Sequence, residues 1–296
     1  MKRKILYIFA RIFSFLPDSL MLRIQYLIRT KRILHLKNPV RFTEKIQHYK
    51  AYYRNPEMQI CTDKYAVREY VSNKLGTDKY LNQLYQVCEK PEEIDFEKLP
   101  SRFVIKTTDG GNGTNIIICK DKTKLNIVST IKEINGWKRI KYYLLSREWA
   151  YLWAASGERK PKIIIEKYLE NTENADGSLD DFKLYCYDGK FRFLLWCKNR
   201  FSGNRRNFYD ENLTLLKDVG NYPNISSEFS LPSNVQDMIT VAEKLSSGFP
   251  FARIDFYDVE GHIVFGEITF YPSTGFATYH PDSFDFELGK YFIIRW

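Results

Sequence analysis

The sequence predicts an α+β fold, in which helices and antiparallel strands occupy different stretches of the chain. Residues 1–60 have a mainly helical pattern, rich in Ile, Leu, Tyr and Arg. From Phe103 onward the pattern changes to short strands separated by glycine-containing turns. Two pairs of these strands are joined by connections too short for a parallel crossover, so each pair is expected to form an antiparallel hairpin.

The composition is that of a folded protein with anionic partners. Of the 296 residues 44% are hydrophobic, and the net charge of +9 is spread along the chain. This balance suits nucleotides, sugar nucleotides, acidic glycans or the inner membrane leaflet. We expect no nucleic-acid partner, because no nucleic-acid module is recognisable. Five cysteines without a CxxC spacing and four scattered histidines indicate a reducing compartment without a zinc site, and therefore a cytoplasmic protein.

The N-terminus has a basic start followed by an apolar run over residues 5–16. Arg11 interrupts that run and no small-x-small cleavage site follows before Pro17, which argues against a signal peptide. The run is also too short to span a bilayer. Two interpretations stay open: an amphipathic helix in peripheral contact with the inner face of the plasma membrane, or a helix packed on its own domain.

Two helices carry clear end signals. Residues 63–75 form one apolar stripe that Thr62 or Asp63 can cap and Gly76 can end. Residues 234–247 form a second stripe, for which Ser233 and Gln236 predict a capping box and Gly248 an end. A helical, aromatic stretch is expected over roughly residues 126–155.

A glycine-rich loop over residues 107–114 joins the expected strands 103–106 and 115–119. Glycines in this loop let backbone N–H groups approach a phosphate, and Lys106 adds a positive charge at the end of the first strand. The loop is not a Walker A motif, because its lysine precedes the glycines. A simple turn between two strands is the alternative.

The expected strand 163–166 runs into the sequence Glu-Lys-Tyr-Leu at residues 166–169. Its backbone groups could bind the edge of an adenine and its apolar side chains the faces, or it is an ordinary strand end.

The hairpin formed by residues 182–187 and 190–196 contains a type I′ turn signal, Asp188-Gly189. A two-residue loop pairs Tyr187 with Lys190 and therefore Lys183 with Leu194. This register predicts one apolar face, with Lys183 on the other.

The final hairpin, formed by residues 252–257 and 262–268, carries the densest set of polar side chains. A three-residue loop over residues 259–261 pairs Asp255 with Phe265 and Arg253 with Glu267, and sets Arg253, Asp255, Glu267 and Thr269 on the face opposite an apolar set that includes Val264. Asp255 and Glu267 then become diagonal neighbours roughly 7–8 Å apart.

Two carboxylates at that spacing can converge on Mg²⁺, which neutralises the phosphates of ATP during transfer. Arg253 beside them can stabilise an oxyanion or a transferring phosphoryl group. An exposed Arg–Glu cross-strand pair without function is the alternative interpretation.

The order of these motifs resembles the ATP-grasp superfamily, which includes D-alanine–D-alanine ligases. The succession is Asp63-Lys64, Lys106 with its glycine loop, residues 166–169, Lys183, Arg253-Ile-Asp255 and residues 267–275. Residues 38–45, 63–71, 204–210 and 248–255 are more closely similar to the TupA-like ATP-grasp family, named for teichuronopeptide synthesis. The likeness covers roughly residues 35–290.

The resemblance implies two α+β lobes that clasp ATP, preceded by a mainly helical region over residues 1–60. Residues 61–100 would begin the ATP-grasp domain. Residues 101–170 would form the first nucleotide-binding lobe with its glycine-rich flap, and residues 171–296 the second lobe with the metal and substrate site.

The resemblance also implies the role of individual residues. Those that would contact ATP are Lys64, Lys106, Gly110, Gly111, Gly113, Glu166, Lys167, Leu169, Glu170 (or Glu173) and Lys183. Asp255, Glu267 and Thr269 would form the magnesium site, although the wider superfamily usually has Asn in the place of Thr269. Arg253 would act at the reacting carboxylate, with residues 273–275 near the acceptor.

Three further arginines, Arg200, Arg205 and Arg206, have no counterpart in the superfamily motif. We assign them to an acidic substrate such as a uronic acid, and we expect Arg205 and Arg206 to act with Arg253 and Lys183 in catalysis.

The expected activity is that of an ATP- and Mg²⁺-dependent carboxylate–amine ligase that acts through an acyl phosphate. Its partners would be ATP, an acidic sugar or polysaccharide precursor of the cell surface, and an amino acid or other amine. Alternatives are a glycosyltransferase of capsule or lipopolysaccharide synthesis, a kinase-like transfer to a hydroxyl, and a non-catalytic anion-binding module.

Overall fold

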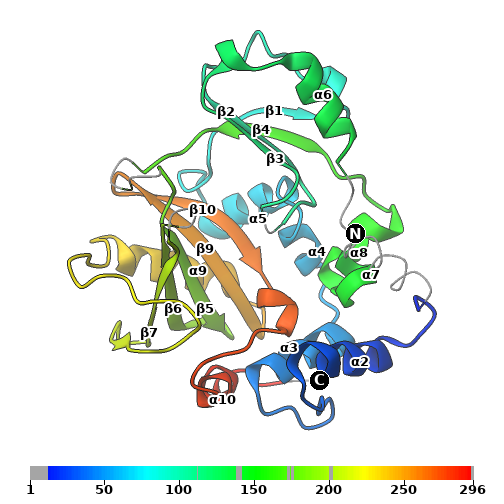
Figure 1. Ribbon diagram of the computed structural model, residues 1–296, viewed down its shortest axis with the longest axis vertical. Helices are drawn as coiled ribbons and strands as arrows, with labels where there is room; N and C mark the ends of the chain where they lie inside the picture. Colours follow the sequence, from blue (N-terminus) through cyan, green and yellow to red (C-terminus); the bar gives the residue numbers. More distant parts are fainter. Residues whose placement is uncertain are drawn as a thin grey trace.

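The computed structural model describes residues 13–111, 113–137, 142–171, 174, 177–199 and 203–294. In this part of the chain the strands form two antiparallel sheets, the smaller above the larger in Figure 1. The smaller sheet has the order β1-β4-β2-β3. Its strands are β1 (Leu84–Cys88), β2 (Phe103–Thr107), β3 (Ile116–Cys119) and β4 (Ile163–Lys167). Helix α6 (Ile127–Asn135) adds Ile134 to the core of this sheet.

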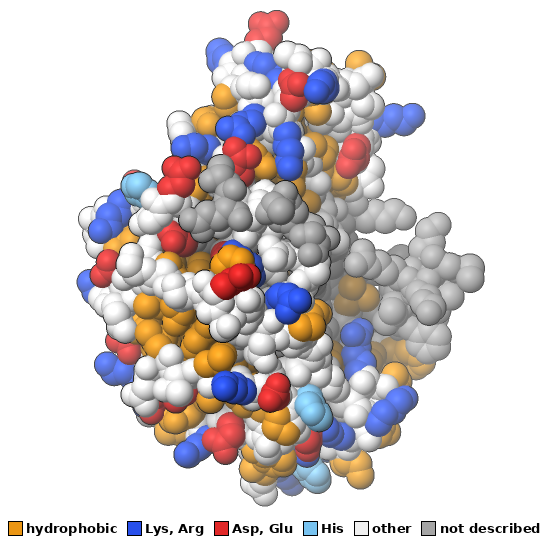
Figure 2. All heavy atoms as spheres, turned by 60° about the vertical axis from the view of Figure 1, so that its left-hand side comes forward, with side chains coloured by type: hydrophobic (Ala, Val, Ile, Leu, Met, Phe, Trp, Pro, Cys, Tyr) orange, Lys and Arg blue, Asp and Glu red, His pale blue; other side chains and the backbone are white. Residues whose placement is uncertain are grey.

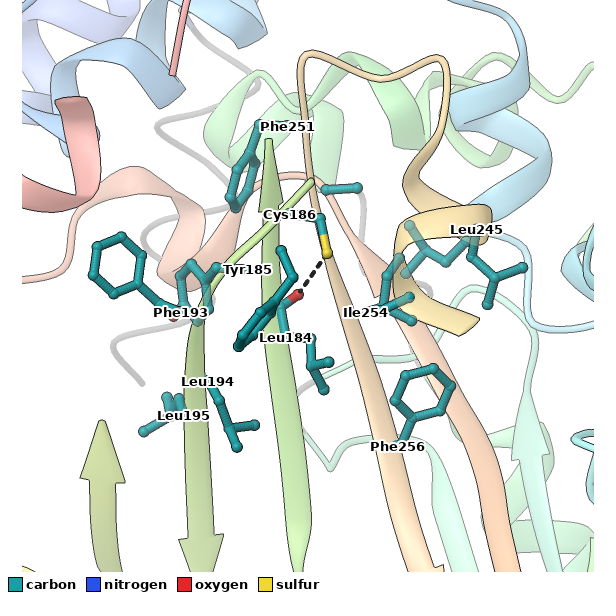
Figure 3. Packing of buried hydrophobic residues seen from close by; sticks show 14 of the residues in the cluster. Leu184, Tyr185, Cys186, Phe193, Leu194, Leu195, Leu245, Phe251, Ile254 and Phe256 are labelled. Atoms are coloured by element: carbon teal, nitrogen blue, oxygen red, sulfur yellow. Dashed lines mark hydrogen bonds between the residues drawn. The ribbon is translucent and has the colours of Figure 1, made fainter. Parts of the chain in front are cut away.

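The larger sheet has six strands in the order β10-β9-β5-β6-β7-β8. They are β5 (Asp181–Tyr187), β6 (Lys190–Lys198), β7 (Arg205–Tyr209), β8 (Leu215–Leu216), β9 (Phe251–Val259) and β10 (His262–Thr269). Helix α9 (Val235–Ser246) covers one face, where its Leu245 packs with Leu184, Cys186 and Ile254 in the main hydrophobic core (Figure 3). The opposite face turns toward the smaller sheet.

Helices fill the space around the two sheets. They are α2 (Asp18–Thr30), α3 (Phe42–Tyr52), α4 (Glu57–Cys61), α5 (Ala66–Leu75), α7 (Tyr142–Ser146), α8 (Leu152–Ser156) and α10 (Ser283–Lys290). Short 3₁₀ turns lie at Pro91–Glu93, Lys122–Lys124, Trp149–Tyr151 and Pro272–Gly275. Helix α3 lies beside α10 below the larger sheet (Figure 1), and its Phe42 ring packs edge-on against Phe251, 5.0 Å between centroids.

The membrane predictions are only partly covered by the described residues. No described helix is both long enough and apolar enough to cross a membrane. Residues 1–12, which hold most of the apolar run in which an amphipathic helix was expected, lie outside the described residues. The five cysteines are all buried free thiols.

The two helix-end predictions have different outcomes. Gly76 ends α5 in the left-handed conformation, as predicted. The helix begins at Ala66, three residues later than expected, and Asp63 accepts hydrogen bonds from the N–H groups of Tyr65 and Ala66 in the turn before it. The capping box of Ser233 and Gln236 is wrong, because α9 starts after Asn234 and has no side-chain cap. The Asn234 amide instead donates to Asp258 and Gly261, which ties the start of the helix to the β9–β10 turn.

The β5–β6 hairpin has the predicted turn but a different register. Tyr187 pairs with Lys190 across Asp188 and Gly189, both with positive φ. A bulge beyond Cys186 then pairs Lys183 with Leu195, and the predicted partner Leu194 is wrong. The extra residue on β6 turns Leu195 to the same face as Lys183.

The β9–β10 hairpin departs from its predicted register twice. Its loop has two residues, Glu260 and Gly261, and a bulge at Gly266 shifts the pairing again. Asp255 therefore lies directly opposite Glu267, and the predicted pairs Asp255–Phe265 and Arg253–Glu267 are wrong. The second shift restores the expected grouping of Arg253, Asp255, Glu267 and Thr269 on one face, whereas Val264 moves from the expected apolar face to the lining of a cavity.

Candidate active site

A cavity of about 860 Å³ lies between the two sheets and is lined by residues from both. Lys64, Lys106 and the glycine loop border it from the side of the smaller sheet. Lys183, Arg253 and Glu267 border it from strands β5, β9 and β10 of the larger sheet. Most of the residues that the sequence singled out therefore share one cavity. Elsewhere on the surface, side chains of both charges are interspersed on the face that Figure 2 shows.

Asp255 organises the floor of the cavity. It pairs across the strands with Lys183, whose Nζ lies 2.7 Å from its Oδ2. Arg253, two residues away on the same face of β9, donates from Nε and Nη2 to the two oxygens of Asp255, at 2.7 Å each. With 2% of its surface exposed, Asp255 holds two cations side by side beneath the cavity.

The ionisation of this floor reflects a balance between burial and charge. Burial disfavours the Lys183 ammonium, but Asp255 and Asp181 outweigh it and raise the pKa of Lys183. Burial raises the pKa of Asp255 against the opposing pull of Arg253 and Lys183. The neighbouring carboxylates therefore keep the buried Lys183 ammonium charged.

Glu267 has a more open position than Asp255. Its side chain is 43% exposed, Thr269 Oγ1 donates to its Oε1 at 2.9 Å, and Lys64 Nζ lies 3.9 Å from its Oε2. Burial opposes its ionisation, but Lys64, Arg253 and Lys183 together lower the pKa of Glu267 to about 2. Glu267 is thus an ionised carboxylate with an edge toward the cavity.

These carboxylates fit a Mg²⁺ ion that is bound together with nucleotide phosphates. Such ions need only one or two protein carboxylates, because phosphates and waters complete the shell. Glu267 fits as it stands, whereas both oxygens of Asp255 already accept hydrogen bonds, which a metal would have to replace. The Thr269 hydroxyl is placed to orient Glu267. Among the described residues no group of three or more His, Cys, Asp or Glu could hold a metal alone.

On the smaller sheet, Glu166 fixes the position of Lys106. The Lys106 Nζ lies 2.6 Å from Glu166 Oε2, and Arg68 reaches the other oxygen at 3.5 Å. The Glu166 carboxylate is therefore committed to two cations. Lys167 and Leu169, predicted beside it in an adenine pocket, also line the cavity. The Lys167 backbone bonds to Gln83 and Asn82.

The glycine loop reaches toward the larger sheet through Lys64. Gly110, Gly111 and Gly113 all line the cavity. Lys64 Nζ donates to the Gly110 carbonyl at 2.6 Å while also facing Glu267. One lysine therefore connects the loop with the carboxylate across the cavity.

Several predicted residues lie elsewhere. Glu170 forms an ion pair with Arg102 and does not border the cavity. Arg205 is exposed and donates to the Asn224 carbonyl, whereas its neighbour Arg206 lines the cavity from the other face of β7. Glu173 and Arg200 lie outside the described residues.

Other residues of the site escaped sequence reasoning. Asp181 lies 3.0 Å from Lys183, and its position two residues before Lys183 on one strand could have revealed it. Gln47 and Lys50, fully buried on α3, donate to the carbonyl of Thr274. Thr274 lies in a turn with positive φ, as does Ser273. No local pattern connects α3 with residues more than 220 positions away.

Comparisons with known proteins identify a family and several solved structures to which this chain is similar. The family described as TupA-like ATPgrasp matches residues 44–293. Solved structures with a similar fold include D-alanine–D-alanine ligase from Bacillus anthracis (18% identity, 71% of this chain and 57% of that chain, TM-score 0.41). D-alanyl-alanine synthetase A from Vibrio cholerae (11%, 73% and 57%, 0.44) and phosphoribosylamine–glycine ligase from Thermotoga maritima (14%, 74% and 51%, 0.42) are similar too.

This chain thus spans between about half and three fifths of the length of each of those three proteins. No curated protein matches its sequence.

Proposed function

Because this chain belongs to the TupA-like ATP-grasp family, we propose that it is an ATP-dependent carboxylate–amine ligase that works through an acyl phosphate and releases ADP. One observation carries the proposal. Lys106 from the smaller sheet and Lys64 from the turn before α5 face the same cavity as Lys183, Arg253 and Glu267 from the larger sheet. That arrangement suits a triphosphate lying between the sheets.

The residues of the chain then have separate tasks in binding. Lys106, held by Glu166, and Lys64 contact phosphate oxygens from one side, together with N–H groups of the glycine loop. Lys183 contacts them from the floor, where Asp255 keeps it charged. Glu267, and Asp255 if it exchanged its present hydrogen bonds, would hold Mg²⁺, which would neutralise charge between the phosphates.

In the reaction, a carboxylate oxygen attacks the γ-phosphorus of ATP, and ADP leaves. The amine nitrogen then attacks the acyl carbon. The bond between the acyl carbon and the phosphate oxygen breaks, phosphate leaves with its electron pair, and the nitrogen loses a proton to solvent. Arg253, fixed by Asp255 with charge-assisted bonds, stabilises the oxyanion that develops at the acyl carbon. Holding both substrates in one closed space supplies much of the remaining acceleration.

For substrates, we propose an acidic sugar in a cell-surface polysaccharide or its precursor, joined to an amino acid. The family's connection with teichuronopeptide synthesis and the basic net charge of +9 support this choice. Peripheral contact of the N-terminus with the membrane would bring the enzyme close to such precursors.

The test is to incubate the protein with ATP, Mg²⁺ and panels of uronic acids and amino acids, and to measure ADP, AMP and product mass. We expect ADP and an amide product, lost in Lys106→Ala and Glu267→Gln but retained in Lys98→Ala, at an exposed surface lysine. AMP would contradict the acyl phosphate. Transfer from a UDP-sugar without ATP would identify a glycosyltransferase, and phosphorylation of a hydroxyl a kinase.

A further inference from the structure

Arg206 is a cation of the cavity whose setting differs from that of the others. Its guanidinium stacks on the Tyr222 ring, 3.7 Å from the ring centroid, and its Nε donates to Asn204 Oδ1 at 3.3 Å. All three side chains border the cavity. The stacking holds the planar group in one orientation. Among the described residues its other N–H groups have no hydrogen-bond acceptor, so they can meet a ligand.

Four cations that line the cavity near Glu166, Asp255 and Glu267 have carboxylate partners. Lys64, Lys106, Lys183 and Arg253 each lie within ion-pair distance of an acidic side chain. Within the described ranges Arg206 forms no such pair; Asn204 and Tyr222, its neighbours there, are uncharged. An arginine that is fixed in place without a counter-charge is preorganised for an anion with bidentate geometry.

The separation between Arg206 and Arg253 in the larger sheet indicates whether both arginines can bind the same anionic group. Strand β7 lies three strands from β9, roughly 14 Å across the sheet at about 4.8 Å per strand. The register sets Arg206 in line with Cys197, Asp181 and Tyr257. That row lies four residues from Arg253, roughly 13 Å along the strands. These are distances between backbones, but each guanidinium is also held by its own neighbours, Arg253 by Asp255 and Arg206 by Tyr222. We therefore expect the two arginines to contact different anionic groups.

We propose that Arg206, Tyr222 and Asn204 form a second anion-binding subsite, which holds an acidic group of the carboxylate substrate other than the one that is activated. The inference rests on the proposed ligase function and narrows its substrate. The substrate carries at least two separated negative groups. Both a sugar linked to a phosphate and an oligosaccharide with repeated carboxylates meet that requirement, and Tyr222 offers a face for a sugar ring.

Direct binding tests the subsite without relying on turnover. Titration calorimetry would compare the wild type, Arg206→Ala and Arg205→Ala, using UDP-glucuronic acid, trigalacturonic acid and the monomer glucuronic acid as probes. We expect Arg206→Ala to weaken binding of at least one of the two multiply charged probes by tenfold or more. Whichever probe responds identifies phosphate or carboxylate as the second anion. Arg205→Ala is the matched control, since Arg205 points away from the cavity on the same strand.

Two further readouts make the test decisive. Binding of ATP and of glucuronic acid should be the same in Arg206→Ala as in the wild type. Arg206→Lys should restore only part of the affinity for the multiply charged probe, because the point charge of an ammonium cannot replace the planar guanidinium. Weaker ATP binding in Arg206→Ala would assign Arg206 to the nucleotide and overturn the proposal. Equal affinities of all variants for both charged probes, or no binding of either by the wild type, would overturn it too. Absence of ADP release with intact probe binding would instead count against the ligase function alone.

Discussion

Asp255 and Glu267 face each other across β9 and β10, but their surroundings give them different tasks. Asp255 is buried and accepts hydrogen bonds from Lys183 and Arg253. Glu267 is 43% exposed and adds negative charge where the cavity opens. We therefore expect Asp255 to contribute mainly to the stability of the folded site and less to ligand binding. Glu267 is expected to contribute mainly to ligand binding.

We predict that Asp255→Asn lowers the free energy of unfolding by about 3–5 kcal/mol, because it leaves two buried cations without their counter-charge. Glu267→Gln should cost less than about 1 kcal/mol, as expected for a partly solvated ion pair. Both should abolish ADP release. Urea denaturation of the two variants measures the difference, and equal losses of stability would contradict the division of tasks.

At the scale of the element, the two hairpins show what sequence reasoning can and cannot predict. Alternation of polar and apolar residues correctly grouped Arg253, Asp255 and Glu267 on one face of the sheet. It missed both bulges, because a bulge changes the pairing of a strand without breaking the alternation visible in short stretches. Beside the bulge in β6, the Phe193 ring packs against Phe284 and Tyr291 near the C-terminus. Contacts with so distant a segment are not visible in the local sequence pattern.

The bulge at Gly266 brings Glu267 opposite Asp255. It depends on the absence of a Cβ atom at this position. A Cβ there would lie 3.0 Å from the Asp255 carbonyl oxygen and 3.3 Å from the Tyr257 ring. We predict that Gly266→Ala lowers the free energy of unfolding by about 1–3 kcal/mol, as overpacking does. It should also reduce ADP release more than tenfold, because Glu267 shifts away from Asp255. His262→Ala, at the exposed start of the same strand, is the control for both measurements. Unchanged turnover in Gly266→Ala would show that the bulge is not needed.

At the scale of the whole molecule, the cavity depends on contacts between the two ends of the chain. Helix α3 carries Gln47 and Lys50, which bond the turn at Thr274 on the cavity wall. Helix α10 in turn fixes α3, since Asp285 accepts hydrogen bonds from the backbone N–H and hydroxyl of Thr43. The sequence predicts a mainly helical region over residues 1–60 but neither α10 nor its contact with α3, because buried polar contacts between distant segments leave no periodic signal.

The tie at Asp285 gives a prediction for the molecule as one cooperative unit. Asp285 is fully buried, so Asp285→Ala leaves the backbone N–H of Thr43 without its acceptor. The Thr43 hydroxyl keeps Tyr26, and Arg41 keeps Asp282. We expect a loss of about 1–3 kcal/mol in the free energy of unfolding, in a single urea transition that both sheets share. Glu287→Ala, exposed on the same helix, should change stability by less than about 0.5 kcal/mol. Two separate transitions in Asp285→Ala would instead mean that α3 and α10 stabilise the larger sheet alone, and that the smaller sheet folds independently of the contact between the chain ends.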